Sequence, residues 1–106
     1  MSRTREIWTL YAGEDVVANL VVTGGDFPWL DARVDPRPAF EGFRRLFDAE
    51  WAASQTEDWD RADELYREIN AALRLADPDG VEVAEFLLHI QGDQAWWRWS
   101  YEPLDD

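Results

Sequence analysis

The amino-acid sequence predicts an α+β protein, in which a single antiparallel sheet of five to six strands carries two consecutive amphipathic helices on one face. Two observations lead to this fold class. Turn signals at 13–15 and 92–93 each lie between runs of β-forming residues and predict β-hairpins. Between them, segments 38–53 and 57–72 carry apolar residues at helical spacing. The expected order is therefore β-β-β-α-α-(β)-β-β, and two such helices need a sheet to cover.

Length and composition predict one acidic domain over residues 1–106. The 106 residues include 23 acidic and ten basic residues, all ten of them Arg, and the net charge is −13. Phosphate backbones repel such a chain, so direct nucleic-acid binding is not expected, whereas a basic partner protein would suit it. The chain has seven Trp and no Cys, which excludes disulfides, zinc–thiolate sites and Cys nucleophiles.

The sequence also predicts a cytoplasmic location. Its first residues lack the apolar run of a signal peptide, and no stretch approaches the ~20 apolar residues of a membrane-spanning helix. The absence of Cys fits a reducing compartment. Residues 1–5 and 102–106 are expected to be loose termini.

Residues 6–12 and 16–23 form the first predicted hairpin, around Gly13-Glu14-Asp15. Side chains alternate across a strand, so each strand has two faces. The more uniformly apolar face is expected to point inward. It consists of Ile7, Thr9, Tyr11, Val16, Ala18, Leu20 and Val22. Trp8 lies on the opposite face and is expected to point outward.

Residues 29–34 predict a third strand, because apolar and polar residues alternate along it. One side carries Leu30, Ala32 and Val34, and the other carries Trp29, Asp31 and Arg33. The preceding Phe27-Pro28 bond is expected to be trans, although flanking aromatic residues favour the cis form.

Two helices are predicted next, and each has an apolar stripe. The first, 38–53, begins at Pro38, a residue suited to a first helical turn. Its stripe is Phe40, Phe43, Leu46, Phe47 and Trp51. The stripe of the second helix, 57–72, is Trp59, Ala62, Leu65, Tyr66, Ile69 and Leu73. Ser54, which has capping-box spacing to Glu57, and Thr56 compete as its N-cap.

A turn at Asp77-Pro78-Asp79-Gly80 is expected to join a short strand at 73–76 to residues 81–83. The last hairpin then folds about Gly92-Asp93, with Gly92 supplying the positive φ of a type II′ turn. This register places His89 opposite Trp96 and Leu88 opposite Trp97. The inward face is Ala84, Phe86, Leu88, Ile90, Ala95, Trp97, Trp99 and Tyr101. A slip by one residue would mix this apolar face with the polar one.

With both helices on the inner face, the outer face of the sheet is expected to be open. Trp and Arg are enriched at binding hot spots, and several lie on this face. The predicted binding residues are Trp96, Arg98, His89, Trp29, Trp8 and Arg33, with Asp31 and Leu87 beside them. Two alternatives remain open. In the first, the strands that carry Trp8 and Trp29 face the other way and these residues belong to the core. In the second, the patch is a homodimer contact.

His89 is the one side chain that suits acid–base chemistry near neutral pH, although lone strand histidines are more often structural. The sequence contains no nucleophile elbow, Gly-rich phosphate loop or zinc-ligand spacing. The segment from Asp77 to Gly80 looks like the start of a calcium loop, but unsuitable residues occupy the later ligand positions. We therefore predict no catalytic residue, no metal site and no cofactor.

The segments DFPWL (26–30) and VAEFLLHIQGDQAWWRWS (83–100) resemble a group of short acidic proteins from high-GC actinobacteria. The resemblance extends loosely over most of the chain. This group has no characterised activity, so the resemblance implies a recurring domain and supplies no site residues.

Taken together, these features predict a non-enzymatic protein-binding module that uses the open sheet face. The alternative is a small-molecule-binding protein or small enzyme with an aromatic pocket around His89, Trp96 and Arg98. The shape of the surface distinguishes the two. A concave pocket that encloses His89 favours a ligand, and a flat or convex Trp-rich face favours a partner protein.

Overall fold

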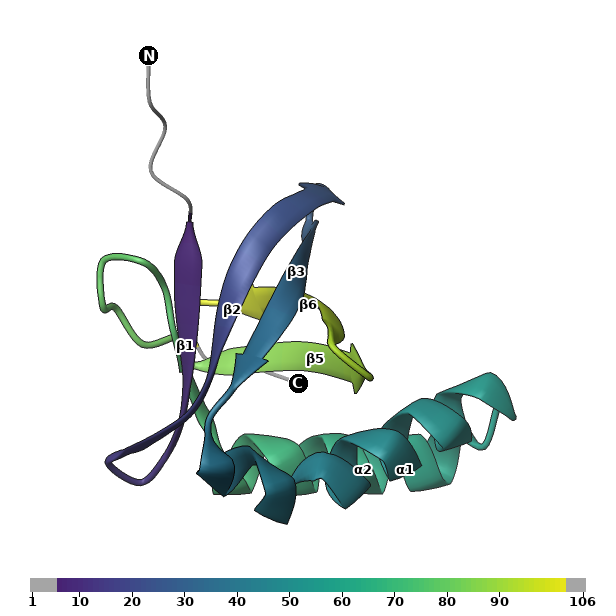
Figure 1. Cartoon of the computed structure of the whole chain (residues 1–106). Helices are drawn as coiled ribbons and strands as arrows, with labels where there is room; N and C mark the ends of the chain where they lie inside the picture. The colour runs from purple at the N-terminus through teal and green to yellow at the C-terminus, as the bar shows by residue number, and fades with distance from the viewer. Residues whose placement is uncertain (1–5, 103–106) are drawn as a thin grey trace.

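The computed structural model describes residues 6–102 and confirms the predicted order of strands and helices (Figure 1). The expected loose ends at 1–5 and 103–106 lie outside the described residues, and Glu102 is exposed. The elements are β1 Ile7–Ala12, β2 Asp15–Asp26, β3 Trp29–Pro36, the 3₁₀ turn η1 Pro38–Gly42, α1 Arg44–Gln55, α2 Trp59–Ala72, β4 Arg74–Ala76, β5 Glu85–Gln91 and β6 Gln94–Ser100.

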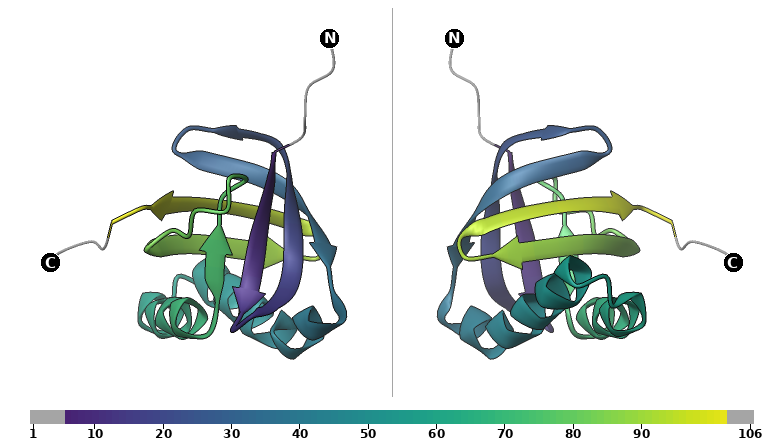
Figure 2. Two further views of the ribbon diagram at one scale, coloured as in Figure 1. Left: turned by 90° about the vertical axis from the view of Figure 1, so that its left-hand side faces the viewer. Right: turned by 90° about the vertical axis from the view of Figure 1, so that its right-hand side faces the viewer.

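The strands form one six-stranded sheet in the order β4-β1-β2-β3-β6-β5, and all neighbours are antiparallel. The sheet curls strongly, so that β5 and β6 run across the direction of β1 and β2 (Figures 1 and 2). The chain between β4 and β5 brings the two edges together at one end, where the Val83 N–H donates to the Leu75 carbonyl. The result is a half-barrel.

The β5–β6 hairpin has the predicted register at every pair from Glu85–Ser100 to Gln91–Gln94. Gly92 has φ +62°, and Asp93 is not among the residues with positive φ, as a type II′ turn requires. The predicted inward residues are buried or half-buried from Phe86 to Trp99. Ala84 and Tyr101 are exposed, because they lie beyond the ends of the two strands.

The first hairpin corrects the predicted orientation of Trp8, which is only 2% exposed and points inward. Next to the turn, Tyr11 pairs with Val16, so these two residues share a face as expected. A β-bulge then leaves Val17 unpaired, so that Trp8 pairs with Leu20. This one-residue shift turns the opposite face of β1 inward, although Leu20 keeps its predicted orientation.

The third strand has the predicted faces, because Ala32 and Val34 are buried whereas Asp31 and Arg33 are exposed. The Phe27-Pro28 bond that precedes it is cis, so the expectation of a trans bond is wrong.

The helices differ from the prediction at their ends. The first turn of the predicted helix 38–53 is the separate 3₁₀ turn η1, and α1 begins after Phe43. Asp58 is the N-cap of α2, where its side chain accepts from the Arg61 N–H, so neither Ser54 nor Thr56 has that role. The Thr56 hydroxyl instead donates to carbonyls at the end of α1.

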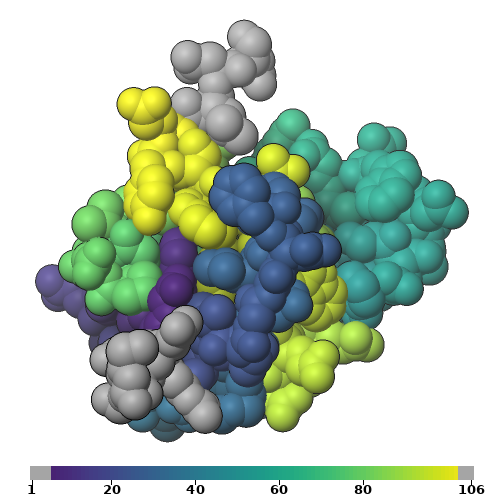
Figure 3. Space-filling model, turned by 90° about the horizontal axis from the view of Figure 1, so that it is seen from above, coloured from purple at the N-terminus to yellow at the C-terminus, as the bar shows by residue number. Residues whose placement is uncertain are grey.

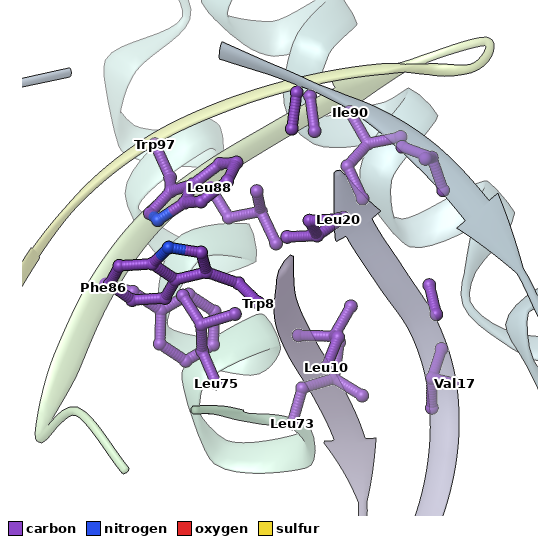
Figure 4. Close-up of a cluster of buried hydrophobic side chains, with 14 of the residues drawn as sticks. Trp8, Leu10, Val17, Leu20, Leu73, Leu75, Phe86, Leu88, Ile90 and Trp97 are labelled. Carbon is purple, nitrogen blue, oxygen red and sulfur yellow. The ribbon is translucent and has the colours of Figure 1, made fainter. Parts of the chain in front are cut away.

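The main hydrophobic core fills the curve of the sheet (Figure 4), and a smaller cluster of Ala53, Ala62 and Leu65 lies between the two helices. Trp8 and Trp97 make an edge-to-face contact in the main core, with ring centroids 5.5 Å apart. Phe47 from α1 and Ile69 from α2 join the same core, which attaches the helix pair to the sheet. Trp59 belongs to the predicted stripe of α2 but is 60% exposed.

The edge of β5 is covered by a side chain from α2. The Asn70 amide group donates to the Phe86 carbonyl at 2.9 Å and accepts from the Phe86 N–H at 3.2 Å. Asn70 therefore replaces a neighbouring strand at this position, which protects an edge that would otherwise present unpaired groups. These two bonds also fix the distance between α2 and the sheet.

We expect Asn70→Ala to lower the free energy of unfolding by about 2 kcal/mol, because it leaves the two Phe86 backbone groups without partners. Urea denaturation followed by tryptophan fluorescence measures this change. The control is Glu68→Ala on the exposed side of the same helix, which should change stability by less than about 0.5 kcal/mol. Equal stabilities for the two variants would contradict the proposed role of Asn70.

Candidate functional site

A cleft of about 1000 Å³ lies between the helix pair and the β5–β6 hairpin. In Figure 1 the helices project beyond the end of β5, and the view from above shows them (teal) on one side of the sheet (Figure 3). Aromatic side chains from both layers form much of the lining. They include Trp29, Trp51, Trp59, Tyr66, Phe86 and Trp99. The cleft is therefore concave and largely apolar, as small-molecule sites usually are.

The strongest polar feature of the cleft is a contact between Glu50 of α1 and His89 of β5. Glu50 Oε1 lies 2.7 Å from His89 Nδ1. The side chains are 2% and 12% exposed, respectively, so the contact is almost shielded from water. The Ser54 hydroxyl donates to the other Glu50 oxygen at 3.0 Å. Both carboxylate oxygens thus act as acceptors.

From this arrangement we infer which ring nitrogen of the neutral His89 ring carries the proton. An ionised carboxylate can only accept, so Nδ1 is the donor to Glu50. Nε2 has no hydrogen-bond partner among residues 6–102, and the one buried side-chain atom without a partner in that range is Trp97 Nε1. Nε2 is therefore not fully buried, and His89 is one of the residues that line the cleft. In the neutral ring it is a hydrogen-bond acceptor.

Three tryptophan rings surround the imidazole of His89. Trp29 stacks on it at 5.9 Å with an interplanar angle of 18°. Trp51 approaches edge-on at 5.9 Å, and Trp96 lies tilted at 5.5 Å. The ring is thus held from the strands and from α1, and its orientation is set by packing as well as by Glu50.

The expectation of an open outer sheet face is wrong around His89 and Trp96, because a side chain from α1 covers the sheet there. Trp51 reaches from α1 over the edge of β5 and packs edge-to-face on Trp96 at 4.8 Å. The helices reach the inner core through Phe47 and Ile69. The helix α1 also lies beside β5, where Trp51 contacts His89 on the outer side of the sheet.

Tyr66 of α2 shows the electrostatic character of the cleft. Burial raises the pKa of its hydroxyl, and the negative charges of Glu85 and Asp63 raise that pKa further. Both carboxylates also line the cleft. Asp63 forms an exposed ion pair with Arg67 at 2.8 Å, whereas Arg98 is the one arginine in the lining.

The predicted binding residues fall into three groups. His89, Trp29 and Arg98 line the cleft together. Trp96 lies behind Trp51 and, with Arg33, lines a separate hollow of about 440 Å³ on the outer face. Trp8 belongs to the core and cannot contact a partner, because the bulge in the first hairpin turns it inward.

Sequence reasoning missed the contribution of the helices to the site. Trp51, Trp59 and Tyr66 were assigned to buried stripes, yet they line the cleft. The sequence did contain one indication that Glu50 is buried. It lies three residues after Phe47 and therefore on the buried side of α1. A carboxylate in that position requires a partner, and the one His of the sequence is the natural candidate.

Comparison of the chain with models of protein families, with curated proteins and with solved structures yields no match. Within residues 6–102, no group of three or more His, Cys, Asp or Glu side chains is arranged to hold a metal ion. No helix in the same range is long and apolar enough to cross a membrane.

Because the chain has one His, its ring gives a single set of NMR signals. We expect long-range ¹H–¹⁵N correlation spectra of the neutral ring to show the Nδ1–H tautomer. Glu50→Ala should shift the population toward Nε2–H, since it removes the acceptor at Nδ1. Glu41→Ala, an exposed carboxylate before α1, is the control and should leave the tautomer unchanged. An Nε2–H tautomer in the unmodified protein would contradict the proposed contact.

Proposed function

We propose that this protein binds a small organic ligand in the aromatic cleft. The observation that carries the proposal is the Glu50–His89 contact within a concave, tryptophan-lined surface. The apolar body of the ligand would pack on the rings, and a donor group of the ligand would bind His89 Nε2. A volume of about 1000 Å³ is sufficient for a drug-sized molecule.

The cost of burying Glu50 supports a functional role for this contact. Taking a carboxylate and an imidazole out of water is unfavourable, and an apolar pair of similar size is often as stable or more stable. The contact orients Nε2 toward the cleft, and an apolar pair could not do so. A preorganised polar group among apolar walls gives a ligand site its specificity.

A second proposal, contact with a partner protein, has one supporting observation. Phe27 at the tip of the β2–β3 hairpin is 94% exposed, next to a shallow hollow that Trp29 and Trp99 also line. A basic partner or a second copy of the chain would bury this ring. Such a contact would depend on Phe27 and not on His89, so substitutions at the two positions separate the proposals.

The neutral fluorescent probe N-phenyl-1-naphthylamine tests the cleft, because it has flat rings and one N–H donor. We expect saturable binding with one probe per chain. Trp59→Ala should weaken it about fivefold, which corresponds to about 1 kcal/mol for one aromatic contact. Trp59 is exposed, so its removal should leave the fold intact.

The matched control is Phe27→Ala, which removes another exposed aromatic ring from outside the cleft. It should leave probe affinity unchanged. Non-saturable binding, or an equal loss of affinity in both variants, would show that the probe binds exposed apolar surface and would contradict the proposal.

A further inference from the structure

We infer that the ligand of the aromatic cleft is a small organic cation, such as a quaternary or protonated amine with an apolar body. This inference rests on the proposed function and adds the charge of the ligand. It depends on two carboxylates and on the electron-rich faces of the aromatic residues that line the cleft.

The two carboxylates come from different elements and act on the same region. Glu85 begins β5 and Asp63 lies on α2, and both line the cleft. Burial is the main cause that raises the pKa of the half-buried Tyr66 hydroxyl. The charges of Glu85 and Asp63 oppose its ionisation and raise that pKa further. Asp63 is also paired with Arg67 at 2.8 Å, so Glu85 supplies most of the negative charge beside Tyr66, and this charge favours a cation over a neutral or anionic ligand.

The aromatic lining reinforces this preference. The faces of Trp and Tyr rings carry partial negative charge and attract cations within about 6 Å of the ring centre. Trp51, Trp59 and Tyr66 all come from the helix pair and line the same wall as Asp63. A cation in this cleft would thus meet both rings and carboxylates, a combination typical of sites for organic amines.

The remaining charges in the lining do not cancel this potential. The Glu50 carboxylate is hydrogen-bonded to His89 Nδ1 and to the Ser54 hydroxyl, so its acceptor oxygens are already engaged. Arg98 is the one arginine in the lining, and it is exposed to solvent, where its field is screened. The net charge of −13 attracts cations to the molecule and repels anions.

Choline and its uncharged isostere 3,3-dimethylbutan-1-ol test the inference, because they share shape and differ in charge. NMR titration of the His89 ring and tryptophan indole signals, at matched ionic strength, follows both. We expect choline to bind about fivefold more tightly, a factor that corresponds to about 1 kcal/mol, supplied mainly by attraction to the carboxylates and reinforced by the ring faces. Glu85→Gln should remove most of this preference, and Arg98→Gln should strengthen choline binding.

Each result bears on a different claim. Equal affinity for the two probes, or a choline preference that survives Glu85→Gln with Asp63→Asn, would overturn the inference. In both cases the cleft would remain a ligand site as long as N-phenyl-1-naphthylamine binds it. If neither choline nor its isostere perturbs the cleft signals while the naphthylamine binds, the inference of a cationic ligand fails but the proposed function stands. If none of the three probes binds, the proposed function fails with it.

Discussion

The contact between Glu50 and His89 is the constraint on which the site depends. It joins the middle of α1 to the edge strand β5 across 39 residues of sequence, and both side chains are almost excluded from water. An isolated carboxylate in this position would be very unfavourable, so Glu50 requires His89 and Ser54 as donors. Satisfying this buried group, together with the packing of Phe47 in the core, holds α1 and with it the wall of the cleft.

The curl of the sheet explains why the cleft forms at β5. Because the inner face is filled by residues such as Trp8 and Trp97, the helices cannot cover it fully. They lie at the edge instead, where Asn70 satisfies the backbone of Phe86 and Trp51 reaches over to the outer face. The space between these two attachments is the cleft. Its aromatic lining therefore comes from segments that are distant in the sequence.

Much of the fold could be predicted from local patterns, and the site only in part. The register of β5–β6 followed from one turn and strict alternation, and the structure confirms it at every pair. The orientation of Trp8 could not be predicted, because a bulge at Val17 leaves no clear mark in an apolar strand. His89, Trp29 and Arg98 were identified as site residues, but the helix that faces them was not, since its position depends on the curvature of the whole sheet.

A double-mutant cycle between Glu50 and His89 tests this dependence most directly. The variants are Glu50→Ala, His89→Ala and the double variant, each unfolded in urea. We expect each single substitution to cost about 3 kcal/mol, because it leaves one buried polar group without its partner. The double variant should cost little more than either one, which corresponds to a coupling energy of about 2 to 3 kcal/mol. Strictly additive costs would contradict the claim that this contact positions α1 and builds the cleft.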